Sequence, residues 1–132
     1  MHEKLKNIYL RIKREGKYDR GEWTGSIILK TSERGRIIGE LFFIIDPIQV
    51  TITELEVKRK YRRQGYGRFL VRIMQAMAEK MNKPLVLYSL DEAIGFYKKL
   101  GFKHIPSSKE KGDLYWLPKR LKKSGKQIQL EY

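Results

Sequence analysis

Hydrophobic and polar residues alternate along the first half of the chain with the period of two that is typical of β-strands. The alternation predicts four strands, over residues 7–13, 23–30, 36–46 and 50–57. A short polar turn, Glu33-Arg34-Gly35, separates the second and third strands, so these two are expected to pair antiparallel. Asp46-Pro47 ends the third strand, because proline cannot donate a hydrogen bond to a neighbouring strand.

The fourth strand has two chemically different faces. Successive side chains of a strand point to opposite sides. The pattern therefore predicts one face with Thr51, Thr53, Leu55 and Val57, and an opposite face with Ile52, Glu54 and Glu56.

The pattern changes to helical spacing after the fourth strand. Apolar residues recur every three or four positions from Phe69 to Met81, which predicts an amphipathic helix over residues 64–82 that ends before Lys83-Pro84. A short apolar strand follows at 85–88, then a helix from a capping Asp91 to Leu100 that stops at Gly101, then strands at 102–105 and 113–117. This order predicts an α+β fold, with a mixed sheet and helices on its faces.

Composition narrows the class of protein. The chain has 132 residues, which fits a single domain over 1–132, with a basic tail from about residue 119. It has no cysteine and two histidines, so no metal site is expected. No segment has the roughly 18 apolar residues of a membrane span, and the first residues lack the apolar core of a signal peptide. We therefore expect a cytoplasmic protein that does not enter membranes.

Charge points to an anionic partner. The chain has 29 Lys and Arg against 15 Asp and Glu, a net charge of +14. Such an excess attracts nucleic acid, an anionic surface or a multiply phosphorylated cofactor.

The segment between the fourth strand and the long helix is suited to bind a phosphate group. It contains Arg62-Arg63-Gln64-Gly65-Tyr66-Gly67-Arg68. The first N–H groups of a helix have no intrahelical partner and lie at the positive end of its dipole. Gly65 and Gly67 lack Cβ atoms, so a phosphate can approach their backbone closely. The position three residues beyond Gly67 is Leu70, which excludes the third glycine of a dinucleotide-binding loop, and the nucleotide P-loop spacing is missing.

Two segments resemble the GNAT family of N-acetyltransferases. Arg62-x-x-Gly65-x-Gly67 resembles the family's coenzyme A signature, and the segment from Ala93 to Phe102, AIGFYKKLGF, resembles its second characteristic segment. The resemblance covers about residues 36–117 and implies a GNAT-like, mostly antiparallel mixed sheet. The chain departs from the family pattern in two places. Few residues separate the first two strands, so the helices usually found there are reduced or missing, and Leu90 stands where many relatives have asparagine.

The resemblance also implies a reaction and its residues. Acetyl-CoA would donate its acetyl group directly to a primary amine, in a peptide, a protein or a small molecule. The cofactor would be held by backbone groups near Leu55 and Val57 and by the turn at residues 62–68. Tyr97 is the candidate acid for the leaving thiolate, and Glu54, ranked before Glu56, is the candidate base.

Other functions remain open from the sequence. The chain is compatible with a nucleic-acid-binding or CoA-binding module on the same scaffold without turnover. The basic tail is a possible contact for an acidic macromolecule, and both a monomer and a homodimer are compatible with the sequence.

Overall fold

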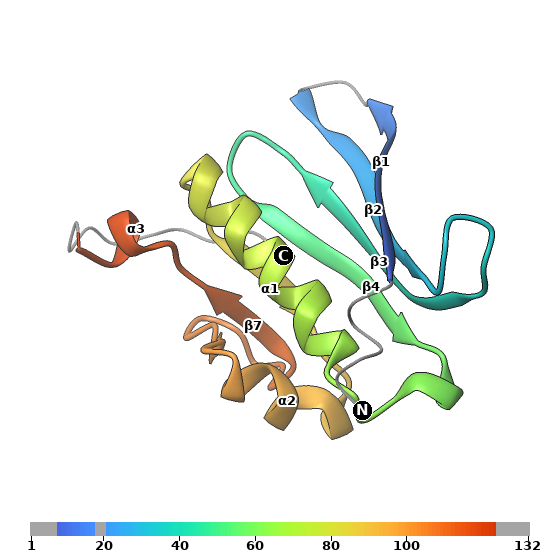
Figure 1. The fold of residues 1–132 in the computed structure, drawn as a ribbon. Helices are drawn as coiled ribbons and strands as arrows, with labels where there is room; N and C mark the ends of the chain where they lie inside the picture. Colours follow the sequence, from blue (N-terminus) through green and yellow to red (C-terminus); the bar gives the residue numbers. More distant parts are fainter. Residues whose placement is uncertain (1–7, 18–20, 124–132) are drawn as a thin grey trace.

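The described residues form a mixed seven-stranded sheet with helices on one face (Figure 1). The computed structural model describes residues 8–17 and 21–123. The strands are β1 (Tyr9–Lys17), β2 (Trp23–Lys30), β3 (Ile37–Ile45), β4 (Val50–Val57), β5 (Leu85–Tyr88), β6 (Lys103–His104) and β7 (Asp113–Trp116). The helices are α1 (Tyr66–Met81), α2 (Ile94–Lys99) and α3 (Lys119–Lys123), with 3₁₀ turns η3 (Arg59–Tyr61) and η4 (Asp91–Ala93).

The sheet has the strand order β1-β2-β3-β4-β5-β7-β6. All neighbours pair antiparallel except β4 and β5, which are parallel and joined by α1. This confirms the α+β prediction, with the predicted order of four strands, helix, strand, helix and two strands.

The parallel pair is short, and this opens the sheet. Pairing between β4 and β5 covers only Val50–Ile52 of β4 against Leu85–Leu87 of β5. Beyond Ile52, no strand in the described part of the chain pairs with β4 on the β5 side. The carboxyl-terminal half of β4 therefore leaves backbone N–H and C=O groups at an open edge inside the sheet.

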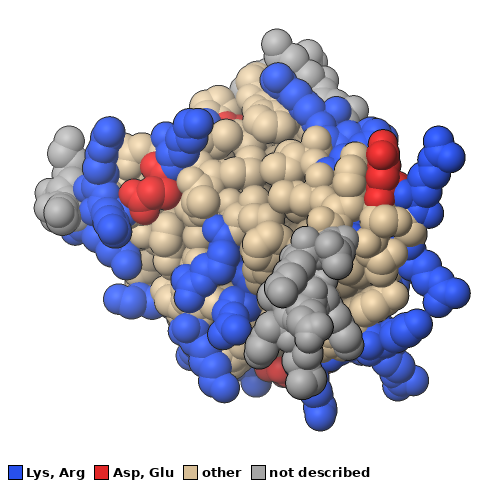
Figure 2. Space-filling view, in the orientation of Figure 1, with Lys and Arg blue, Asp and Glu red and all other residues tan. Residues whose placement is uncertain are grey.

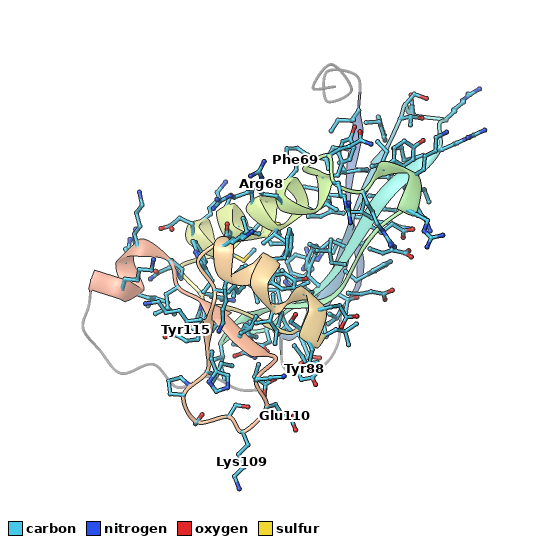
Figure 3. All side chains as sticks on the ribbon, turned by 90° about the horizontal axis from the view of Figure 1, so that it is seen from below. Arg68, Phe69, Tyr88, Lys109, Glu110 and Tyr115 are labelled. Atoms are coloured by element: carbon cyan, nitrogen blue, oxygen red, sulfur yellow. The ribbon has the colours of Figure 1, made fainter. Side chains whose placement is uncertain are left out.

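The helices α1 and α2 pack on the same face of the sheet. Buried α1 residues such as Leu70 and Met74 belong to one hydrophobic core with Leu41 and Phe43 of β3 and with Tyr97 of α2. In Figure 3, Arg68 and Phe69 of α1 lie on the upper side, and Tyr88 and Tyr115, from β5 and β7, lie on the lower side. No helix of the described residues covers the opposite face of the sheet in Figure 1.

The predicted face assignment of β4 was wrong for Thr51 and Ile52, which exchange faces because the strand contains a β-bulge. Phe42 pairs with Glu54 and Phe43 with Ile52, so Thr53 has no partner on β3. The extra residue reverses the alternation. Ile52 therefore shares the α1 face with Leu55 and Val57, whereas Glu54 and Glu56 point to the other face, together with Glu40.

The termini of several elements also differ from prediction. The first strand extends to Lys17, which leaves residues 18–22 as the link to β2, too short for the family's pair of helices. Residues 18–20 of this link lie outside the described residues. The long helix begins at Tyr66 and not at Gln64, since Gly65 is its N-cap.

Asp91 does not cap the second helix. It lies within η4, makes no capping hydrogen bond and pairs with Lys111 at 3.4 Å. The helix α2 begins only at Ile94, because the preceding turn is 3₁₀. Gly101 stops it as predicted, with φ of +97°. The predicted basic tail begins with α3, and its continuation from residue 124 lies outside the described residues.

Among the described residues, no helix has the length and apolar character needed to span a membrane, and no group of three or more His, Asp or Glu is placed to bind a metal ion.

Candidate functional site

The predicted phosphate-binding segment forms a tight turn between β4 and α1. Arg62 closes it: its Nε donates a hydrogen bond of 2.8 Å to the carbonyl oxygen of Val57, the last residue of β4. Arg63 has φ of +63° and Gly65 has φ of +89°, so two residues adopt the left-handed conformation. Such backbone is costly for a residue with a side chain, and it is typical of functional loops. The turn is therefore held in a defined shape by its own residues.

The turn presents free donors at the start of α1. The first intrahelical hydrogen bond runs from Phe69 N–H to Gly65 C=O at 3.0 Å. The N–H groups of Tyr66, Gly67 and Arg68 therefore have no intrahelical partner. The N-cap residue, Gly65, has no side chain that could accept a hydrogen bond from these N–H groups, and the first turn of α1 contains no acidic residue. These donors and the helix dipole form an anion site that the chain itself leaves unfilled.

Gly67 contributes space beside these donors. A Cβ built there would lie 3.5 Å from Phe96 Cζ and 3.7 Å from Val57 Cγ2, which are ordinary contacts. Alanine therefore fits, whereas a longer side chain would extend toward Phe96 and Val57.

A cavity of about 700 Å³ opens from this turn. Its lining includes nine predicted residues: Leu55, Glu56, Val57, Arg62, Arg63, Gly65, Tyr66, Gly67 and Arg68. It also includes six residues that sequence analysis did not identify: Tyr61, Arg72, Ala93, Phe96, Lys99 and Leu100. Arg72 follows Arg68 by one helical turn, and this spacing is a signal that could have found it. Predicted residues Gln64, Glu54 and Tyr97 do not line the cavity.

The cavity is strongly positive. Five of its lining residues are Arg62, Arg63, Arg68, Arg72 and Lys99. The salt bridges of the described residues are Lys58–Glu56 at 3.2 Å and Lys111–Asp91 at 3.4 Å, and neither involves a cavity cation. In Figure 2, Lys and Arg side chains project around the rim of the molecule, and few acidic side chains lie among them. The positive charge of the cavity is thus available to an anionic ligand.

Tyr66 is a core residue and not an exposed ligand contact. Its side chain is 2% exposed, and its ring packs edge-on against Tyr61 at 6.4 Å. Burial, and secondarily the neighbouring Tyr61, raise the pKa of the Tyr66 hydroxyl. Its contribution to an anion site is its backbone N–H.

Tyr97 lies directly behind the cavity wall. Its ring is 5.0 Å from the ring of Phe96, which lines the cavity, and 5.5 Å from that of Phe102. Burial raises the pKa of the Tyr97 hydroxyl to about 12. The phenol therefore keeps its proton throughout the physiological range.

The two glutamates occupy different surroundings. Glu56 lines the cavity, and its Oε1 is 3.2 Å from Lys58 Nζ. Glu54 is exposed, lies opposite Phe42 on β3 and is further from the turn along β4.

Comparisons with known proteins agree with this architecture. A family model described as an acetyltransferase (GNAT) domain matches residues 24–104. Among solved structures, an acetyltransferase from Bacillus cereus is 25% identical, with a TM-score of 0.60, over 73% of this chain and 71% of that one. Tetrahymena GCN5 is 24% identical, with a TM-score of 0.58, over 70% and 66% of the two chains. AtaTR bound with AcCoA is 21% identical, with a TM-score of 0.64, over 78% and 73%. No curated protein matches the chain significantly.

Proposed function

We propose that this chain, which belongs to the GNAT acetyltransferase family, transfers an acetyl group from acetyl-CoA directly to a primary amine. Family membership and the similarity to known acetyltransferases support acetyl transfer in general. The observation that carries the finer proposal is the unfilled anion site at the start of α1, at the mouth of a cavity that reaches the open edge of β4.

The residues present fit coenzyme A in three respects. The free N–H groups of the α1 first turn and the arginines of residues 62–68 match a diphosphate. The apolar side chains of Leu55, Val57 and Phe96 match a pantetheine arm. The backbone of β4 beyond Ile52, which has no partner strand on the β5 side, can hydrogen-bond the amides of that arm, in the manner of an added strand.

The base is a glutamate of β4 in this proposal. When bound, acetyl-CoA supplies the thioester carbonyl that an amine attacks. The amine must lose a proton, and a carboxylate near the carbonyl can accept it directly or through water. Glu54 lies two residues beyond Ile52, where the pairing of β4 with β5 ends, and Glu56 lines the cavity but is engaged by Lys58. These surroundings favour Glu54 as the base, with Glu56 as the alternative.

In this proposal Tyr97 donates a hydrogen bond to the sulfur of the leaving coenzyme A. Its pKa of about 12 lies above the value of about 8.5 for an ordinary thiol, so complete proton transfer to a thiolate is uphill by about 5 kcal/mol. A hydrogen bond from the neutral phenol stabilises the developing thiolate without that cost. Tyr97 reaches the sulfur only if the thioester lies between β4 and β5, beside Phe96.

The proposed acceptor is a primary amine, and the fold alone does not determine whether it belongs to a small molecule, a peptide or a protein. Similar structures include an AtaT mutant toxin bound to part of its antitoxin and a KacTA–DNA complex, both under 20% identical. The absence of room for helices between β1 and β2 favours an open acceptor groove, which suits a peptide or protein amine.

The test is a thiol-release assay with acetyl-CoA against polyamines, amino acids, aminoglycosides and amino-terminal peptides. We expect release that depends on one acceptor class and falls at least about tenfold in Glu54→Gln and in Tyr97→Phe. Arg34→Ala, a change in the β2–β3 turn, serves as the control and should keep full activity. Tight acetyl-CoA binding with no acceptor-dependent release from any class would reject the transferase and leave a CoA-binding module.

A further inference from the structure

The cavity has a second group of cations, away from the glycine turn. Arg72 lies seven residues after Gly65 on α1, about 10 Å further along the helix axis. Lys99, the last residue of α2, lines the same cavity. The glycine turn provides the donors for one anionic group, so these two cations are in excess of what that group requires.

Arg72 is held in place by a buried side chain. Its Nη1 donates a hydrogen bond of 3.1 Å to Gln75 Oε1, and Gln75 Nε2 donates one of 2.8 Å to the carbonyl oxygen of Leu100. Gln75 is 4% exposed, although it is polar. The Gln75 amide thus fixes the Arg72 guanidinium beside the end of α2. This contact uses one of the five N–H donors of the guanidinium. The remaining donors are free to bind a ligand. Because the side chain is already ordered in the free protein, it loses little further conformational entropy when a ligand binds.

We infer that Arg72 and Lys99 form a second anion subsite, which binds the 3′-phosphate of coenzyme A. This inference rests on the proposed function. Coenzyme A carries its diphosphate and its 3′-phosphate as separate anionic groups on one molecule. A cavity that has cations at the glycine turn and also on α1 and at the end of α2 matches that arrangement, and a planar guanidinium binds a phosphate through two parallel hydrogen bonds. Gln75 is the positioning residue of the subsite.

The specificity of the site follows from this geometry. Ligands that have the diphosphate and pantetheine but lack the 3′-phosphate lose the contacts of Arg72 and Lys99. Charge-assisted hydrogen bonds of this kind correspond to about a tenfold change in affinity at a partly exposed site. The chain should therefore discriminate coenzyme A from 3′-dephospho-coenzyme A.

The experiment is calorimetric titration of the full chain with these two ligands at one ionic strength. We expect the wild type to bind coenzyme A about tenfold more tightly than its 3′-dephospho form. Arg72→Ala should bind both ligands with nearly the affinity that the wild type has for the dephospho form. Arg34→Ala removes the same charge from an exposed turn outside the cavity and should keep the full preference.

Gln75→Leu tests the positioning role. It should lower the affinity for coenzyme A and leave that for the dephospho form unchanged, whereas a general loss of packing would weaken both equally. Equal binding of both ligands by the wild type, or full preference in Arg72→Ala, would overturn the subsite and leave the proposed function intact. Binding of neither ligand by the wild type would reject the proposed function together with the subsite.

Discussion

Arg63 combines two roles that can be separated by substitution. Its backbone has φ of +63°, a conformation that costs a residue with a Cβ about 1 kcal/mol, and its side chain lines the cavity. The chain retains arginine where glycine would adopt the same backbone more easily. This choice is explained if the side chain contributes to binding an anion.

Arg63→Gly should therefore weaken binding and leave stability nearly unchanged. Relief of the left-handed strain offsets the greater flexibility of glycine in the unfolded chain, so the free energy of unfolding should stay within about 1 kcal/mol of the wild type. Loss of the guanidinium should weaken acetyl-CoA binding several-fold. Urea unfolding and calorimetric titration measure the two quantities. A destabilised variant with unchanged affinity would assign Arg63 a purely structural role.

Burial of Tyr97 makes stability depend on pH in the alkaline range. Its pKa is about 12 in the folded protein and about 10 when exposed. The contribution is fully present below pH 10 and is lost as the pH rises toward 12, because the unfolded chain ionises first. At pH 11 the loss amounts to about 1.4 kcal/mol. Chemical unfolding between pH 9 and pH 11 should therefore show a larger decline for the wild type than for Tyr97→Phe. Parallel declines in the two proteins would contradict the burial of this hydroxyl.

At the scale of elements, the bulge in β4 links the sheet to the candidate site. Thr53 is the unpaired residue, and it lies where the pairing of β4 with β5 ends. A bulge bends its strand and increases the local twist. We infer that the bulge directs the second half of β4 away from β5 and so keeps the edge open for the pantetheine arm.

Deletion of Thr53 tests this link. Without it, Phe42 still faces Glu54 and Phe43 still faces Ile52, so the pairing becomes regular and the core face is preserved. The deletion variant should fold, as judged by circular dichroism, and bind acetyl-CoA at least about tenfold more weakly. Thr53→Ala keeps the bulge and should bind normally. Wild-type affinity in the folded deletion variant would separate the bulge from binding.

Local patterns in the sequence predict the elements but not how they fit together. The bounds of β2 and β4 are as predicted, because alternating apolar residues followed by turn residues define them within the segment itself. The bulge at Thr53 depends on the register with Phe42 and Phe43, which no local pattern encodes. The contact of Gln75 with Leu100, 25 residues away, likewise arises only when α1 and α2 pack together. The sequence thus predicted the glycine turn, and missed the α2 side of the cavity.

At the scale of the whole molecule, the net charge of +14 exceeds what one molecule of coenzyme A requires. Lys and Arg side chains are spread around the rim of the face shown in Figure 2. Such a surface predicts weak, nonspecific attraction of nucleic acid that depends on ionic strength.

Fluorescence anisotropy with labelled RNA and DNA measures this attraction. We expect binding at 50 mM salt that weakens steeply, by a factor of about 10³ or more, at 200 mM. Acetyl-CoA should compete poorly with the nucleic acid, because it occupies one cavity, whereas the positive charge that attracts nucleic acid is distributed over the surface. Tight binding at 200 mM salt that acetyl-CoA displaces would instead favour the nucleic-acid-binding alternative.

The central claim is that the turn before α1 binds the diphosphate of acetyl-CoA, and titration of three proteins with acetyl-CoA tests it most directly. Gly67→Ala adds a methyl group at ordinary contact distance, and Gly67→Glu adds a carboxylate beside the free N–H groups of the helix. We predict micromolar-range affinity for the wild type, a similar value for Gly67→Ala and no measurable binding for Gly67→Glu, with all three proteins folded. Absence of binding to the wild type, or undiminished binding to Gly67→Glu, would contradict the account.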